Sequence, residues 1–227
     1  MQIDRSTLTP RRRLAVLAVP LVAVVSIAAA CVPPTPPPPP TGPTVLAQGG
    51  VDAPGIAFED GEWDLHVHDE DNDVEYEPDE VILKVKDEAA TTVPADPAFG
   101  FLGASGDPIW VLPQVQNADL LYLGYATEEI ESGVFEGDEV TWSLVSVDGP
   151  GSFHLYSTDG FGVPTVLFDS DDALPQSLVV PTGAHIHQNW GFTAPGDYTV
   201  TYEVTGTPVG DVPVSSGPVE YSFTVGG

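Results

Sequence analysis

The sequence predicts an all-β protein, a single Ig-like or jelly-roll β-sandwich that follows a signal peptide and a proline-rich tether. Segments with apolar residues at every second position recur along the chain after residue 80, and this period of two is typical of strands. Glycine- and proline-rich turns separate these segments, for example at Asp148–Gly151 and Pro195–Asp197. Many short strands joined by such turns favour a sandwich over a helical fold.

Six segments alternate clearly enough to be assigned as strands. In chain order they are VILKVK (81–86), EVTWSLVSV (139–147), FHLYS (153–157), TVLF (165–168), DYTVTYEV (197–204) and VEYSFTV (219–225). No stretch keeps a helical period, and residues 126–135 are the one place where a short helix is expected. The part of the chain that follows the signal peptide and the tether, residues 51–227, is long enough for one domain with a single buried core.

The N-terminal part of the chain is predicted to target and tether the protein. Residues 1–30 combine a basic start, ending at Arg11–Arg13, with an apolar run and small residues before Cys31, a pattern similar to bacterial lipoprotein signal peptides. We expect a secreted protein held at the cell membrane by a lipid on Cys31, facing the extracellular or periplasmic side. An ordinary secretory signal is the alternative. Residues 31–50 would form an extended, proline-rich linker, and residues 51–227 the β-sandwich surface domain.

The charge balance narrows the class of partner. The chain has 34 Asp and Glu against 6 Lys and Arg, which gives a net charge of −28. We expect no nucleic-acid partner, because phosphate binding needs Lys and Arg. The single Cys argues against a disulfide scaffold and a Cys-rich zinc finger. The acidity either keeps the surface solvated, on a cell exterior or in a salty habitat, or attracts cations.

Four of the five histidines form two His-x-His pairs, His66 with His68 and His185 with His187. Residues i and i+2 of a strand point to the same face, so each pair can present two imidazoles to one ion. Two pairs would supply the ligands of a tetrahedral Zn²⁺ site without a thiolate. His154, in the segment FHLYS, is a candidate fifth ligand. The alternative for each pair is chance or packing.

Several side chains close to the pairs in sequence are candidates to orient the imidazoles or to replace one of them as a ligand. These candidates are Asp64, Asp69, Glu70 and Asn189.

The acidic loop Asp69–Glu80 is a second candidate cation site, for Ca²⁺. Its carboxylates have the spacing of a calcium-binding loop, at Asp69, Asp71, Asp73 and Glu80. The loop differs from an EF-hand, because Val74 stands where that loop has glycine and Pro78 interrupts it.

Long strings around the histidines carry a family resemblance. They are WDLHVHDEDNDVEYEPDEVILKV (63–85), FGFLGASGDPIWVLPQVQNADLLYLGYATEEIESGVF (99–135), GPGSFHLYSTDGFG (149–162) and GAHIHQNWGFTAPGDYTV (183–200). These strings resemble the choice-of-anchor M family, also described as actinobacterial surface-anchored domains. They are most similar to its branch repressed by the zinc uptake regulator (Zur) in cyanobacteria. The resemblance covers roughly residues 55–225.

The resemblance implies a surface domain. Members of this family carry varied anchors, and some members travel with metal-type ABC transporters. Repression by a zinc sensor implies a role under zinc scarcity. The His-x-His elements of the family correspond to His66 with His68 and to His185 with His187, the second followed by Asn189 and Trp190.

We therefore expect a non-enzymatic, extracytoplasmic zinc-binding protein. It would capture zinc, or relay it to the substrate-binding protein of an ABC-type uptake system, under zinc limitation. Binding should weaken below about pH 6 as imidazoles protonate.

Two other functions stay open at this point. One is a surface adhesion or glycan-binding module with structural Ca²⁺ and exposed tryptophans, which would be Trp63, Trp110, Trp142 and Trp190. The other is a metal-dependent hydrolase, which would need an open coordination position and a carboxylate base such as Glu70. Serine catalysis has no support, because the chain lacks a G-x-S-x-G motif.

Overall fold

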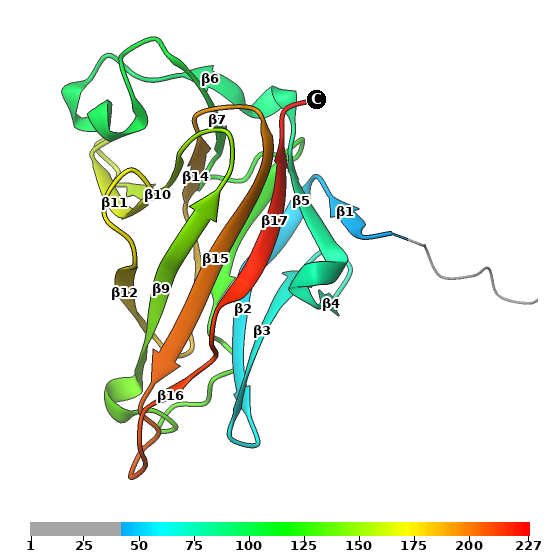
Figure 1. Ribbon diagram of the computed structural model, residues 1–227, viewed down its shortest axis with the longest axis vertical. Helices are drawn as coiled ribbons and strands as arrows, with labels where there is room; N and C mark the ends of the chain where they lie inside the picture. The colour runs from blue at the N-terminus through cyan, green and yellow to red at the C-terminus, as the bar shows by residue number, and fades with distance from the viewer. Residues whose placement is uncertain (1–41) are drawn as a thin grey trace, which may run out of the picture. The chain divides into compact units, whose positions relative to one another are not determined.

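The computed structural model describes residues 42–227 and confirms the all-β sandwich prediction (Figure 1). Strands make up most of this part of the chain, and its helical content is limited to short 3₁₀ turns. Within these residues, no helix is long and apolar enough to cross a membrane. The expected signal peptide, Cys31 and most of the expected linker lie outside the described residues.

The strands are short, apart from a few long ones that run through the centre of the molecule. They are β1 Thr44–Leu46, β2 Gly49–Glu59, β3 Glu62–Asp69, β4 Val74–Tyr76, β5 Val81–Val85, β6 Ala90–Thr92, β7 Pro108–Leu112, β8 Leu121–Ala126, β9 Glu139–Asp148, β10 Phe153–Thr158, β11 Pro164–Asp169, β12 Gln176–Pro181, β13 His185–His187, β14 Asn189–Phe192, β15 Gly196–Gly206, β16 Val214–Ser215 and β17 Val219–Val225. The 3₁₀ helices are η1 Pro78–Glu80, η2 Asp87–Ala89, η3 Pro97–Leu102 and η4 Glu136–Asp138.

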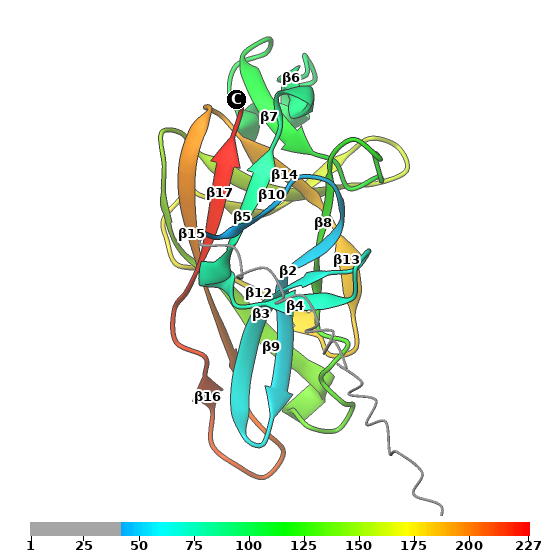
Figure 2. The ribbon, with the colours of Figure 1, turned by 90° about the vertical axis from the view of Figure 1, so that its right-hand side faces the viewer.

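The strands form three sheets. The largest has the order β1-β5-β17-β15-β9-β12, with β16 paired to β15, and its long strands β9, β15 and β17 run side by side in Figure 1. The second sheet has the order β11-β10-β14-β7-β6, and the third has the order β13-β8-β2-β3-β4. Figure 2 shows the third sheet on the side of the molecule that faces the viewer.

One continuous hydrophobic core joins the three sheets. In β9 the alternation expected from the sequence sends Val140, Trp142 and Leu144 inward, and Trp142 packs against Phe168 and Tyr202 with both ring-centroid distances at 5.0 Å. This alternation buries one face of the strand and leaves the other polar. All six segments predicted to be strands are strands in the structure, as β5, β9, β10, β11, β15 and β17.

Residues 126–135 do not form the expected helix. The chain leaves β8 at Ala126 and turns instead, with Gly133 at a φ of 85°. The buried Thr127 fixes this turn, because its hydroxyl donates to the Pro181 carbonyl (2.8 Å) and accepts from the Ala184 amide (2.9 Å). These contacts hold the segment as an ordered loop over the third sheet.

The folded body begins earlier than the expected boundary at residue 51. Residues 44–46 form β1, which pairs in parallel with β5, and Gly49 already starts β2. The segment 44–50 therefore belongs to the sandwich and not to the linker.

The two faces of the third sheet differ in chemistry. Leu65 and Val67 of β3 point into the core, while the alternate positions His66 and His68 point to the opposite face. An antiparallel pair can bury one face and keep the other polar. This outward face carries the candidate functional site.

Candidate metal centre

The strand register brings both His-x-His pairs onto the third sheet. His187 of β13 lies opposite Gly124 of β8, Gly124 lies opposite Asp52 of β2, and Asp52 lies opposite His68 of β3. One row across four strands therefore contains a histidine from each pair with a carboxylate between them. The two pairs are far apart in sequence, so the sheet alone brings them together.

Asp52 is the residue at the centre of this row. Its Oδ1 lies 3.0 Å from Nε2 of His185, and its Oδ2 lies 3.8 Å from Nδ1 of His68. Only 1% of Asp52 is exposed, which is rare for a carboxylate that has no Lys or Arg partner. The sequence analysis missed this residue, and the only signal for it was an isolated acidic residue in the otherwise uncharged segment QGGVDAPGIAF.

Glu70 completes a group of four potential ligands. Its Oε1 lies 3.5 Å from Nε2 of His185 and 3.8 Å from Nε2 of His187. One ligand atom from each of Asp52, Glu70, His185 and His187 lies within 4.8 Å of all the others. We call these four residues the central group.

Several atoms of the central group are buried without a hydrogen-bond partner. They are Oδ1 of Asp52, Oε1 of Glu70 and Nδ1 of His187. Buried polar atoms in folded proteins nearly always have a partner, so unsatisfied ones need an explanation. Lone pairs that converge from carboxylates and neutral imidazoles are the donor set of a metal cation.

Glycines on the neighbouring strands make room for these side chains. A Cβ at Gly124 would lie 3.0 Å from Nδ1 of His187 and 3.1 Å from Oδ1 of Asp52. A Cβ at Gly50 would lie 2.9 Å from the carboxylate of Glu70. These contacts are closer than ordinary packing allows, so both positions need glycine for the group to keep this arrangement.

An aromatic stack fixes one of the imidazoles. The ring of Tyr122, on β8, lies parallel to that of His187, with ring centroids 3.5 Å apart and planes 7° apart. The ring centroids of His185 and His187 are 4.9 Å apart. The stack limits rotation of the His187 ring and keeps its Nε2 toward Glu70.

In the absence of a cation, burial disfavours the charged forms of Asp52 and His187 in the central group. Burial raises the pKa of Asp52 to about 6; His185 opposes this rise and Glu70 adds to it. Burial also lowers the pKa of His187 to about 4, and the neighbouring His185 lowers it further. Near pH 7 the His187 imidazole is therefore neutral, which is the form that binds a metal.

His66 lies in a separate group on the same face of the sheet. Its Nε2 lies 3.3 Å from Oε1 of Glu129, and ligand atoms of His66, Glu75 and Glu129 all lie within 4.8 Å of one another. Asp64, one of the expected orienting residues, has Oδ1 3.9 Å from Nδ1 of His66. We call His66, Glu75 and Glu129 the outer group. The four histidines expected to share one site are thus not brought together. His185 and His187 belong to the central group and His66 to the outer group, while His68 belongs to neither.

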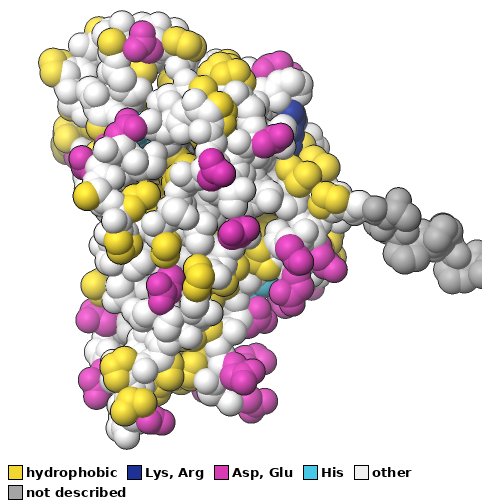
Figure 3. Space-filling view, viewed as in Figure 1, with side chains coloured by type: hydrophobic (Ala, Val, Ile, Leu, Met, Phe, Trp, Pro, Cys, Tyr) yellow, Lys and Arg dark blue, Asp and Glu magenta, His cyan; other side chains and the backbone are white. Residues whose placement is uncertain are grey.

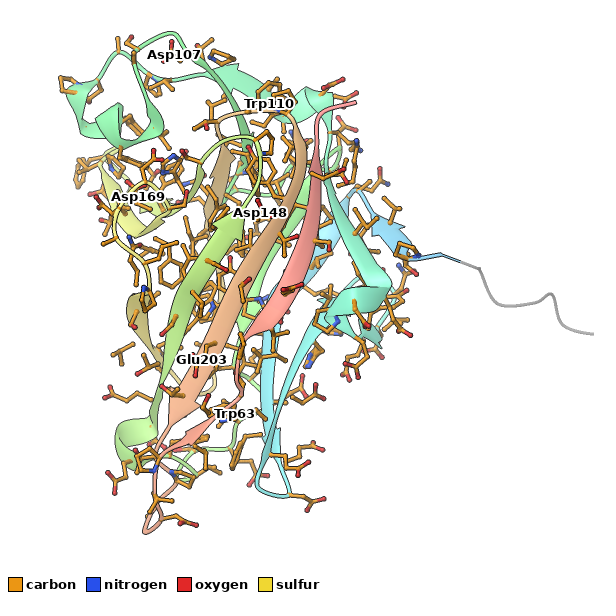
Figure 4. The ribbon with its side chains drawn as sticks, viewed as in Figure 1. Trp63, Asp107, Trp110, Asp148, Asp169 and Glu203 are labelled. Carbon is orange, nitrogen blue, oxygen red and sulfur yellow. The ribbon has the colours of Figure 1, made fainter. Side chains whose placement is uncertain are left out.

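His154 does not join either group. It lies on β10 in the second sheet, with Nδ1 3.1 Å from Oδ1 of Asp169, and its side chain is fully buried. Figure 4 shows Asp169 on β11, on the opposite side of the view from β3 and β4. His154 is therefore not the fifth ligand of a site on the third sheet.

Two of the expected supporting residues have other roles. The side chain of Asn189 donates to Oε1 of Gln114 (2.8 Å) and accepts from the Gln114 amide (3.0 Å), so it links β14 to the segment after β7. The carboxylate of Asp69 accepts from the side chain (2.8 Å) and the amide (3.2 Å) of Asn72 and closes the turn after β3. The partners of both side chains in these hydrogen bonds are residues other than histidines.

The expected calcium loop and the expected aromatic surface are not supported by the geometry. Within residues 42–227, no potential cation-binding group includes Asp71, Asp73 or Glu80. Trp142 and Trp190 are fully buried, while Trp63 and Trp110 are partly buried and pack against the core. Trp63 stacks on Phe135 with centroids 5.0 Å apart. The four tryptophans therefore form no exposed platform for a glycan.

Acidic side chains cover the surface around the site. Figure 3 shows acidic side chains scattered over the visible face, with a denser group of them beside histidine surface near β3 and β4. Lys84 and Lys86 are the only Lys or Arg residues within the described range, and both lie at β5 or just after it. This distribution favours the approach of cations over that of anions.

No protein-family model, curated protein or solved structure matches this chain. The resemblance to the choice-of-anchor M family therefore stays a prediction from the sequence. The fold and the side-chain clusters define the class of protein only as far as an all-β sandwich with histidine–carboxylate groups. Two of these groups lie on the third sheet, and a further one, His154 with Asp169 and Asp171, lies on the second.

Proposed function

We propose that the protein binds one Zn²⁺ ion at the central group and serves to capture this metal outside the cytoplasm. The observation that carries the proposal is the convergence of Asp52, Glu70, His185 and His187 from separate segments, with buried ligand atoms that have no other partner. Two imidazoles and two carboxylates suit the tetrahedral coordination that zinc prefers. Their two negative charges would be neutralised by one divalent ion.

The donor set selects among metals. Ca²⁺ and Mg²⁺ take oxygen ligands, so two imidazole nitrogens favour a first-row transition ion. The group has no thiolate and no thioether, which are the ligands typical of Cu(I). Cu²⁺ binds such nitrogen sites more tightly than Zn²⁺ by intrinsic preference, so the zinc assignment also relies on the zinc-regulated branch that the sequence resembles.

Capture and relay require that the ion can enter and leave. The side chains of His185 and Glu70 are 26% and 29% exposed, while Asp52 is buried beneath them. An ion bound at the central group would therefore contact solvent on one side only. This geometry suits reversible binding and transfer to the substrate-binding protein of an uptake system, with the protein held near the membrane by the expected lipid on Cys31.

A zinc titration of the purified full-length protein tests the proposal. Competition with a chromophoric chelator should show one tight Zn²⁺ equivalent, which the double variant His185→Ala/His187→Ala and the single variant Asp52→Asn both weaken by about a hundredfold or more, since each removes a ligand. Glu131→Gln, which removes an exposed carboxylate from the adjacent loop, is the matched control and should leave this equivalent unchanged. Equal zinc affinity in all four proteins would contradict the proposal.

A further inference from the structure

We infer that the outer group, His66 with Glu75 and Glu129, is a second binding site for a divalent first-row transition ion, separate from the central group. The inference does not depend on the proposed zinc site, because it rests on a different histidine and different carboxylates. The three ligand atoms come from β3, β4 and the loop after β8, and all lie within 4.8 Å of one another.

The buried imidazole of His66 is the strongest observation. Only 4% of the residue is exposed, and neither ring nitrogen has a hydrogen-bond partner. Its Nε2 points toward Glu129, at 3.3 Å from Oε1. A buried imidazole normally hydrogen-bonds through at least one nitrogen, and an unsatisfied nitrogen that faces carboxylates is arranged as a metal ligand would be.

The backbone beneath His66 is adapted to the position of this ring. A bulge in β2 between Asp52 and Gly55 brings Gly55 opposite His66, and a Cβ at Gly55 would collide with Nε2 and Cδ2 of the imidazole. Bulges of this kind redirect side chains and are frequent beside functional sites. Any other residue at this position would force the imidazole or the backbone to shift.

The negative charges around the outer group are not balanced by a Lys or Arg within residues 42–227. Three carboxylates face His66, namely Asp64, Glu75 and Glu129. Lys84 binds the Gly226 carbonyl and Lys86 lies near Gln48, so neither lysine reaches this group. Even a protonated His66 would balance only one of three negative charges, whereas a divalent ion balances two and takes the lone pair of the neutral imidazole.

The ligand types indicate the class of ion. One imidazole nitrogen excludes a preference for Ca²⁺ or Mg²⁺, and two carboxylate oxygens suit Mn²⁺, Fe²⁺ or Zn²⁺. Glu75 and Glu129 are exposed, so water would fill the remaining coordination positions. With three protein ligands in place of four, this site should bind Zn²⁺ more weakly than the central group.

The loop after β8 connects the two sites. Oε2 of Glu128 lies 3.3 Å from Nδ1 of His185, and Oε1 of Glu129 lies 3.3 Å from Nε2 of His66. Consecutive residues of one loop thus contact a histidine of each group. An ion at the outer site would therefore be linked to the central group through this loop.

Titration of the full-length protein with Zn²⁺, followed by the NMR signals of the imidazole nitrogens, tests the inference. We expect a second, weaker equivalent that perturbs the His66 signals, and we expect Glu75→Gln and Glu129→Gln each to weaken it by about tenfold or more, since each removes a ligand. Both residues are exposed, so these variants should fold normally. Glu131→Gln, on the same loop, should keep the second equivalent unchanged.

The variants separate this site from the central one. In His185→Ala/His187→Ala the ion that perturbs His66 should still bind, which supports the outer site whether or not the central site exists. The inference is overturned if Zn²⁺ leaves the His66 signals unchanged in the wild type. It is also overturned if the second equivalent is indifferent to both Glu75→Gln and Glu129→Gln, which would place that ion elsewhere.

Discussion

Replacing Asp52 with asparagine should change how the stability of the metal-free protein depends on pH. Burial raises the pKa of this carboxyl from 3.8 to about 6, an effect that His185 opposes and Glu70 increases. Because a tenfold change in proton affinity corresponds to about 1.4 kcal/mol, keeping Asp52 ionised in the folded chain costs about 3 kcal/mol. Asparagine has nearly the same shape and no charge, so the variant escapes this cost.

The sign of the effect follows from where the proton is bound more tightly. Between about pH 4 and 6 the folded protein holds a proton on Asp52 that the unfolded chain has already lost, so the free energy of unfolding falls as the pH rises. Below this window Asp52 is protonated in both states and costs nothing. The free energy of unfolding of Asp52→Asn minus that of the wild type should therefore rise by about 3 kcal/mol across the window and stay constant above it.

His187 acts in the opposite direction in the same pH range. Burial, with a further contribution from His185, lowers its pKa from 6.5 to about 4, so between these values the unfolded chain binds more protons and stability rises with pH. This gain is also about 3 kcal/mol. The two effects nearly cancel in the wild type, and Asp52→Asn should reveal the contribution of His187.

Urea unfolding in the presence of a chelator, followed by tryptophan fluorescence, measures the difference at several values between about pH 4 and 7. Trp142 and Trp190 are fully buried and report global unfolding. Glu62→Gln, which removes an exposed carboxylate from the β2–β3 hairpin, controls for the general loss of a negative charge. Parallel pH profiles of Asp52→Asn and the wild type would refute the reasoning.

Four further outcomes are expected. The apparent Zn²⁺ affinity of the wild type should fall about tenfold each time the pH is lowered by one below pH 6, because Asp52 must lose its proton to bind the ion. Competition titrations at a series of pH values measure this dependence. Tyr122→Leu removes the ring stacked 3.5 Å from His187 and should weaken Zn²⁺ binding about two- to tenfold with little change in melting temperature, as calorimetry of the free and loaded protein would show. Asn189→Ala should cost about 2 kcal/mol in urea unfolding, because the backbone amide of Gln114 loses its acceptor and the Gln114 side chain loses one of its donors; an altered zinc stoichiometry would contradict a purely structural role of Asn189. Trp142→Ala should cost about 3–5 kcal/mol because it empties the centre of the core, and a loss below about 1 kcal/mol would show that this core relaxes far more than its packing suggests.

Several of the strands that the sequence predicted owe this to a clear alternation, which β2 lacks. In β9 and β17 apolar and polar residues alternate, because one face of each strand is buried and the other is not. β2 reads GGVDAPGIAFE and is buried along most of its length, so its glycines and proline resemble a loop while its pairing with β3 and β8 makes it a strand. Only the tertiary structure supplies those partners.

The site was predictable in part for a similar reason. The His-x-His pairs identify the face that carries the ligands, but Asp52 has no motif and reaches the site only through the register of β2. Asn189 follows His187 closely in sequence, yet the chain passes from the third sheet to the second at Gln188. Proximity in sequence therefore assigned Asn189 to the wrong neighbourhood.

The division of the central group between β2–β3 and β13 also has a consequence for how the chain folds. Asp52 and Glu70 are made early in synthesis and His185 and His187 late. Only the complete third sheet, in which β13 pairs with β8 and β8 with β2, brings them together. A partial chain would thus hold fragments of the ligand set without the arrangement, and contacts this distant in sequence form slowly. If zinc binds as proposed, it would stabilise only the finished fold, so the metal-free protein should be less resistant to proteases than the zinc-loaded one.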